Sequence, residues 1–304
     1  LDKRSNHFFS TTHITNLIKL ILTSNTKFFN GRIFHQIKGT AMGTPMAVSY
    51  ANLFMSYFES GLLDSYSKKF GRQPSLWFRF IDDIFFVWTG SEDSLKHFLQ
   101  FCNEYGENNK MKSNIKFSYS YSTKEINFLD VTVKMEPDGF LSTSLFTKAS
   151  STHRYLHARS SHPPHTTRAL PKSQFIRIRR ICSFIHDYRK HSNEFIKYFE
   201  KRGYKPTYLL QTAEDVAKMN RQELLVYKER QETDRIPLVI TWNHRIRGIS
   251  KVIQSTYRSI VTQFPEFKKV FPVAPMVAYR RPKNLASFLV KDRYIKKDKK
   301  TLER

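Results

Sequence analysis

The sequence has little cysteine, few acidic residues for its basic content, and no long apolar run. Cys102 and Cys182 are the only cysteines among 304 residues, which excludes a disulfide framework or a cysteine-rich zinc site and favours a reducing compartment. Apolar runs such as 84–88 are far too short to span a bilayer. The N-terminal residues contain no apolar signal segment, so we expect an intracellular protein that is not secreted and has no membrane partner.

The shortage of acidic residues leaves a large positive charge. The chain holds 51 Lys+Arg against 26 Asp+Glu, a net charge of +25. The first 150 residues have 17 basic and 13 acidic residues, and the remainder has 34 and 13. Such an excess favours a polyanionic partner. Aromatic residues interleave with the basic ones in 153–157 and 175–180, as in nucleic-acid grooves. A solvated basic surface is the alternative, and the amphipathic character of 172–190 leaves membrane binding open on charge alone.

The hydrophobic pattern predicts an α+β fold, with helices packed on an antiparallel sheet and a mainly helical second part. Expected helices cover residues 11–22, 46–63, 92–104, 172–190, 193–202, 207–228 and 246–262. Expected strands and hairpins cover residues 27–34, 77–88, 115–119, 126–135, 140–148 and 235–242. Asn30-Gly31 and Asp138-Gly139 are hairpin-turn signals. The step His162–Pro164 resists helix, so we expect two domains, 1–164 and 165–304.

Two adjacent acids, Asp82 and Asp83, lie inside the segment Trp77–Trp88, which is otherwise apolar except for Arg79. In a regular strand one of them would point into the core, where an unpaired carboxylate is costly. They therefore lie at an exposed hairpin tip, or a cation neutralises them, and both conditions hold if the tip binds Mg²⁺. A plain Asp-Asp turn in a surface hairpin is the alternative. Trp77 and Trp88 are expected to anchor the two strands.

A stretch of small residues precedes the helix expected from Met46. Glycine lets backbone N–H groups approach an anion, and a helix N-terminus adds positive potential. These features predict a loop that contacts template or nucleotide, and a simple strand-to-helix turn is the alternative. The residues assigned to nucleotide or template binding are Gln36, Gly39, Met42, Gly43, Thr44 and Pro45.

Together these motifs resemble the reverse transcriptase of Penelope-like retroelements, over most of the chain. Gly39–Met55 (GTAMGTPMAVSYANLFM) is similar to that family's template- and nucleotide-binding loop and helix, and Phe80–Phe86 (FIDDIFF) is similar to its Asp-Asp hairpin. Ile126–Val133 (INFLDVTV) is similar to a later palm strand. Leu145–Pro163 and Ser173–Cys182 are similar to the junction into the thumb, which is helix-turn-helix-like in animal members.

The resemblance implies a right-hand polymerase, in which this chain supplies the later palm and a helical thumb. The implied activity is RNA-directed DNA synthesis by two-metal nucleotidyl transfer in a retrotransposon. The implied cofactors are two Mg²⁺ ions, held in part by Asp82 and Asp83, and the implied partners are an RNA template, a DNA primer and deoxynucleoside triphosphates. Contacts to the nucleic-acid backbone are expected from Lys148, Arg154, Arg168, Lys172, Arg177, Arg179 and Arg180.

The chain departs from the family pattern in three respects. We expect the first catalytic Asp of the family, which lies on a strand upstream of these motifs, to be missing together with the fingers, so activity of this chain alone is uncertain. Met42 replaces a Gln found in many reverse transcriptases. The alternative function is a catalytically inactive nucleic-acid-binding protein derived from such an element, and a metal nuclease is a third hypothesis.

Three further features have a structural and a functional interpretation. The histidines at 153, 157, 162 and 165 suggest phosphate contact or local packing, with zinc as the lesser alternative. Asp130 is assigned a structural role. The basic tail Lys291–Lys300 has the composition of a nuclear-import signal, in agreement with an expected nuclear location.

Overall fold

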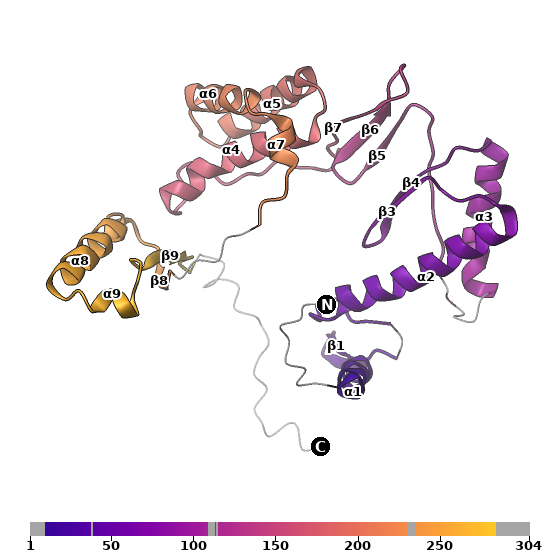
Figure 1. Cartoon of the computed structure of the whole chain (residues 1–304), viewed down its shortest axis with the longest axis horizontal. Coiled ribbons are helices and arrows are strands. Elements are labelled where there is room, and N and C mark those ends of the chain that lie inside the picture. Colours follow the sequence, from indigo (N-terminus) through magenta and orange to yellow (C-terminus); the bar gives the residue numbers. More distant parts are fainter. Residues whose placement is uncertain (1–9, 38, 109–112, 114, 230–234, 284–304) are drawn as a thin grey trace. The chain divides into compact units, whose positions relative to one another are not determined.

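The computed structural model describes residues 10–37, 39–108, 113, 115–229 and 235–283, so the basic tail lies outside the described residues. The chain divides into two compact units, Leu1–Tyr121 and Ser122–Arg304. Each unit combines helices with antiparallel strands, which confirms the coarse α+β expectation (Figure 1). Among the described helices, none is both long and apolar enough to cross a membrane.

The first unit contains two hairpins and three helices. Its elements are α1 (Thr11–Thr23), β1 (Thr26–Phe29), β2 (Arg32–His35), α2 (Ala47–Phe70), β3 (Leu76–Phe80), β4 (Asp83–Val87) and α3 (Glu92–Asn108). Strands β1 and β2 pair across Asn30-Gly31, and β3 pairs antiparallel with β4. The hairpins at 27–34 and 77–88 are therefore confirmed.

The second unit has a three-stranded sheet, a helical bundle and a smaller strand pair with its own helices. Its elements are β5 (Glu125–Phe128), β6 (Val131–Met135), β7 (Leu141–Leu145), α4 (Pro164–Ile181), α5 (Ile185–Glu200), α6 (Pro206–Ala217), α7 (Arg221–Leu225), β8 (Pro237–Thr241), the short 3₁₀ helix His244–Ile246, α8 (Ile249–Gln263), α9 (Phe267–Val270) and β9 (Met276–Arg280). The sheet order is β5-β6-β7, and β8 pairs parallel with β9.

The core of the first unit forms where α2 and α3 meet the β3–β4 hairpin. Phe58 and Leu62 on α2 and Phe98 on α3 are completely buried. Trp77 stacks on Phe86 across the hairpin at 5.4 Å between ring centroids. These rings exclude water and attach the hairpin to the helices beneath it.

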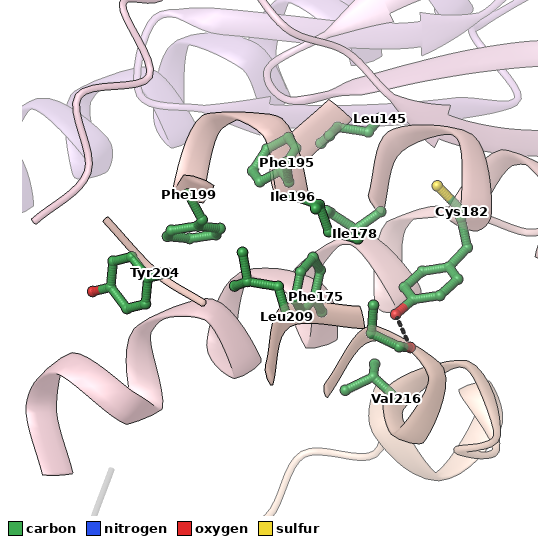
Figure 2. Close-up of a cluster of buried hydrophobic side chains, with 12 residues drawn as sticks. Leu145, Phe175, Ile178, Cys182, Phe195, Ile196, Phe199, Tyr204, Leu209 and Val216 are labelled. Carbon is green, nitrogen blue, oxygen red and sulfur yellow. Dashed lines mark hydrogen bonds between the residues drawn. The ribbon is translucent and has the colours of Figure 1, made fainter. Parts of the chain in front are cut away.

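The core of the second unit is a cluster contributed mainly by α4, α5 and α6 (Figure 2). Phe175 and Ile178 from α4, Phe199 from α5 and Leu209 from α6 are all completely buried. The Tyr188 hydroxyl donates a hydrogen bond of 2.7 Å to the Ala213 carbonyl, which ties α5 to α6. The helices are thus held in one arrangement, and each presents a fixed outward face.

Helix α2 runs past the end that the sequence suggested. It was expected to end near Leu63, close to Gly61, but it continues to Phe70 and ends at Gly71, whose φ is 66°. Gly61 is an interior residue of the helix. A Cβ added at this position would be 2.6 Å from the Tyr105 hydroxyl, which explains why the residue is glycine. The glycine permits close packing of α3 and does not mark a helix end.

The prediction of a strand at 115–119 is wrong. Residues 115–122 have no regular structure. The Phe117 backbone N–H donates to Asn103 Oδ1 at 2.6 Å, and Asn103 Nδ2 donates to the Phe117 carbonyl at 3.2 Å. A side chain of α3 therefore satisfies the backbone groups that a neighbouring strand would otherwise bind.

The helix expected at 172–190 is two helices. Helix α4 begins at Pro164 and ends at Ile181, and Cys182 and Phe184 have extended backbone. Ser183 exchanges hydrogen bonds with Thr143 of β7, through its own N–H and its hydroxyl. The sheet thus holds the connection extended and breaks the helix. Because β7 contacts α4 and α5, the sheet belongs to the same compact unit as the helices, which begins at Ser122.

The remaining helices differ from expectation mainly at their ends. The helix predicted at 193–202 is the second half of α5, and the one at 207–228 divides into α6 and α7. Asn220 separates those two because its side chain accepts from the Gln222 N–H and caps α7.

Candidate functional site

The two aspartates lie at the tip of the β3–β4 hairpin. Phe80 pairs with Asp83, so Ile81 and Asp82 form the two-residue turn. Both carboxylates are exposed, which confirms the predicted position. Ile81 has φ of 57°, a left-handed conformation that a β-branched residue rarely adopts. Strain of this kind persists only where surrounding contacts impose it, and it concentrates at functional sites.

Arg79 supplies those contacts. Its Nε lies 2.8 Å from Glu59 Oε1, and both side chains are 11% exposed. Its Nη1 donates to Asn52 Oδ1 at 2.8 Å and to the Ile81 carbonyl at 3.1 Å. One guanidinium thus joins two residues of α2 to the strained turn. Sequence reasoning missed this role, although a lone Arg in an apolar strand was a visible signal.

Arg79 therefore does not neutralise the aspartates. Neither the Asp82 nor the Asp83 carboxylate has an ion pair or hydrogen bond to any residue that the structure describes. Two adjacent carboxylates offer the hard oxygen ligands that Mg²⁺ prefers, with waters and substrate phosphates completing the shell. Within the described part of the chain, no three His, Cys, Asp or Glu side chains gather as metal ligands. The donor chemistry fits Mg²⁺ binding that depends on substrate oxygens.

The tryptophans anchor the hairpin, as predicted. Trp88 stacks on Phe98 of α3 at 5.0 Å between ring centroids. Its indole N–H donates to Ser94 Oγ at 3.0 Å. The hairpin base is therefore fixed to α3, and its tip is fixed to α2 through Arg79.

The expected nucleotide loop precedes α2. Gly39 and Gly43 have φ of 78° and 91°, so glycine is needed at both positions. The Thr44 carbonyl accepts from the Ala47 N–H at 2.9 Å, with Pro45 in the turn before the helix. The Met42 side chain is completely exposed. The loop therefore opens the same helix that carries Asn52 and Glu59, so α2 connects the loop with the hairpin tip.

The basic residues assigned to backbone contact fall into two groups. Five are exposed and available to a phosphate: Lys148, Arg154, Arg168, Lys172 and Arg180. The other two are less accessible. Arg177 pairs with Asp130 at the β5–β6 turn, in agreement with a structural role for Asp130. Arg179 buries its Nε and Nη1 without a hydrogen-bond partner among the described residues.

The histidine-rich segment packs against α5. His153 stacks on Tyr198 at 4.0 Å between ring centroids, with the rings 7° from parallel. Tyr155 stacks on Phe199 at 4.7 Å. The Arg202 Nε donates to the Tyr155 carbonyl at 2.7 Å. Local packing accounts for this part of the segment.

Comparison with known proteins identifies one region. Residues 154–213 match the family model of an animal helix-turn-helix domain, a stretch that covers α4, α5 and most of α6. The helix-turn-helix expected in this part of the chain is thus confirmed. No curated protein and no solved structure matches the chain.

Proposed function

We propose that the chain provides the later palm and the thumb of an RNA-directed DNA polymerase of the Penelope-like kind. The observation that carries this proposal is the exposed Asp82–Asp83 tip, which Arg79 holds in a strained turn without neutralising either carboxylate. A two-residue hairpin turn commonly has a positive φ, and Leu129 in the β5–β6 turn also has one, of 55°. What supports a role for the Asp82–Asp83 tip is the nearly buried Arg79–Glu59 ion pair that holds it while both carboxylates stay exposed.

Each part of the chain has a distinct task in this proposal. Asp82 and Asp83 hold Mg²⁺, which when bound supplies the positive charge that phosphoryl transfer requires. The loop Gln36–Pro45 positions the template and the incoming nucleotide. Exposed cations of the second unit hold the phosphates of an RNA template and DNA primer, largely independently of sequence. A retrotransposon enzyme of this type would work in the nucleus.

Primer extension tests the proposal. The full chain is incubated with a DNA primer on an RNA template, deoxynucleoside triphosphates and Mg²⁺. We expect slow extension, because the first catalytic Asp of the family is expected to be missing, and Asp82→Asn or Asp83→Asn should abolish it. Asp64→Asn, which removes an exposed carboxylate of α2, should leave it unchanged. Extension that is equal in all three variants would refute the assignment.

A second candidate is a nucleic-acid-binding protein without catalysis. The helix-turn-helix match on 154–213 favours it, since DNA-binding helix-turn-helix domains bind a duplex through two helices. In this case the chain binds nucleic acid with strong salt dependence, and Asp82→Asn changes neither binding nor any product. Binding without extension in the wild-type chain would select this candidate.

A further inference from the structure

Helix α5 presents a stripe of basic and polar residues on its outward face. The side chains of His186, Lys190, Asn193, Lys197 and Lys201 are all exposed. Their spacing of three or four residues places them along one side of the helix. The opposite side is fixed in the core by Tyr188, Phe195 and Phe199. The stripe is therefore held facing away from the bundle.

The lysines of this stripe are available to a ligand. The ammonium groups of Lys190 and Lys197 form no ion pair or hydrogen bond with any described residue. Two nearby acids have other partners. Glu194 Oε2 lies 3.3 Å from His191 Nδ1, and Glu214 Oε1 lies 3.9 Å from Arg189 Nη2. Exposed Glu200 lies at the C-terminal end of the helix, beyond Lys197.

Helix α6 offers the opposite charge. Its outward face carries Glu214 and Asp215, both exposed. Gln211 Nε2 donates to Asp215 Oδ1 at 2.8 Å, so that amide is also occupied. Lys205 and Lys218 lie only at the two caps of the helix. A phosphate backbone would be repelled by the last turn of α6 and attracted by the middle of α5.

The connections between the helices identify the same element. A DNA-binding helix-turn-helix joins its helices by a turn of about three or four residues and places the second helix in the major groove. Only Cys182–Phe184 separates α4 from α5, whereas Lys201–Lys205 separates α5 from α6. The α4–α5 pair fits this description, with α5 as the second helix. Exposed Arg168, Lys172 and Arg180 on α4 then suit the flanking backbone.

We propose that α5 enters the major groove of double-stranded DNA, with Lys190 and Lys197 on phosphates and Asn193 between them at the base edges. This inference rests on the second candidate function, duplex binding by the helix-turn-helix region, and goes beyond it by naming the helix, the groove and the duplex. Lys190 and Lys197 are seven residues apart, about 10 Å along a helix, which is comparable with a B-form major groove of about 12 Å. Asparagine can bind adenine with two hydrogen bonds. The deep, narrow major groove of A-form RNA would exclude the helix.

Salt-dependent binding of the full chain to a fluorescent DNA duplex tests the assignment of α5. The double variant Lys190→Gln/Lys197→Gln is compared with Lys205→Gln/Lys218→Gln, which removes the same charge from α6. Two lost phosphate contacts reduce the slope of log affinity against log salt by about 1.8. The α5 variant should show this reduction, and the α6 variant should keep the wild-type slope. Equal slopes for the two variants, or a larger effect in the α6 variant, would overturn the assignment.

Two further measurements distinguish binding in the major groove from attraction to the phosphate charge alone. A duplex of double-stranded RNA should compete at least tenfold less well than DNA of the same sequence, and equal competition would overturn the major-groove placement. Selection from randomised DNA duplexes should enrich adenine at one position for the wild type but not for Asn193→Ala. Identical enrichment, or none in either protein, would overturn the base contact. Failure of the wild-type chain to bind any nucleic acid would instead refute the proposed function.

Discussion

Arg79 of β3 and Glu59 of α2 form an ion pair of 2.8 Å with both side chains 11% exposed. The same guanidinium donates to the carbonyl of Ile81, the strained residue next to Asp82. The position of the aspartates therefore depends on a contact made within the first unit, away from the carboxylates themselves. Because the ion pair is nearly buried, each partner is costly to leave alone.

Arg79→Ala should destabilise the first unit by about 3 kcal/mol, because Glu59 would be left buried without its partner. Urea unfolding followed by the fluorescence of Trp77 and Trp88 measures the loss. The double variant Glu59→Leu/Arg79→Met removes both charges and should recover much of the stability. A single variant as stable as the wild type would show that the ion pair does not hold the hairpin.

Gly61→Ala should destabilise the protein, although alanine is the better helix former by about 1 kcal/mol. The new Cβ would lie 2.6 Å from the Tyr105 hydroxyl, and that contact forces Tyr105 off Phe58, on which it packs edge-on at 5.4 Å. The expected net loss is about 1 kcal/mol by urea unfolding.

A matched control isolates the cause. In a Tyr105→Phe background the obstructing oxygen is absent, and the next ring atom is 3.7 Å from the Cβ position. Gly61→Ala should then be stabilising. If the alanine destabilises both backgrounds equally, the clash is not the reason for glycine at this position.

The protein should lose stability above about pH 9. Burial raises the pKa of the Cys102 thiol from 9.0 to about 12, and it also raises the pKa values of Cys182 and Tyr188. A folded-state pKa above the unfolded one stabilises the protein fully below the unfolded value, and this stabilisation declines as pH rises towards the folded value. The free energy of unfolding should therefore fall between pH 9.0 and about 12.

Thiol labelling provides an independent measurement for the same groups. At alkaline pH iodoacetamide should modify both cysteines rapidly in urea and only slowly in the native chain, because the buried thiols remain protonated. Equal rates in the two conditions would show that the thiols are accessible in the fold.

The sequence predicted local features well where one short pattern determined the structure. The Asn30-Gly31 turn and the Asp82–Asp83 hairpin tip follow from turn chemistry and from the cost of burying a carboxylate. Prediction from the sequence failed where a contact with a residue far along the chain determined the local structure. Asn103 satisfies the backbone of Phe117 and prevents a strand there, and Thr143 holds Ser183 and breaks the helix. These contacts join residues far apart in the chain, so no local pattern reports them.

The candidate site was predicted to a similar extent. The exposure of Asp82 and Asp83 was predictable, but the Arg79 contacts with α2 depend on packing between elements. Arg177 was expected to contact phosphate, yet it pairs with Asp130 across the second unit. The stripe on α5 escaped notice because the break at Cys182–Phe184 sets which residues of that helix face outward.

The central claim is that Asp82 and Asp83 hold a divalent ion beside a polynucleotide, and iron-mediated cleavage tests it most directly. Fe²⁺ replaces Mg²⁺ in the full chain bound to a primer on an RNA template, and peroxide with ascorbate then generates radicals at the metal. The account predicts cuts in the chain at the β3–β4 turn and in the bound strands near the primer end, both lost in the Asp82→Asn/Asp83→Asn variant while binding persists. Cuts that are absent, or that remain in the double variant, would contradict it.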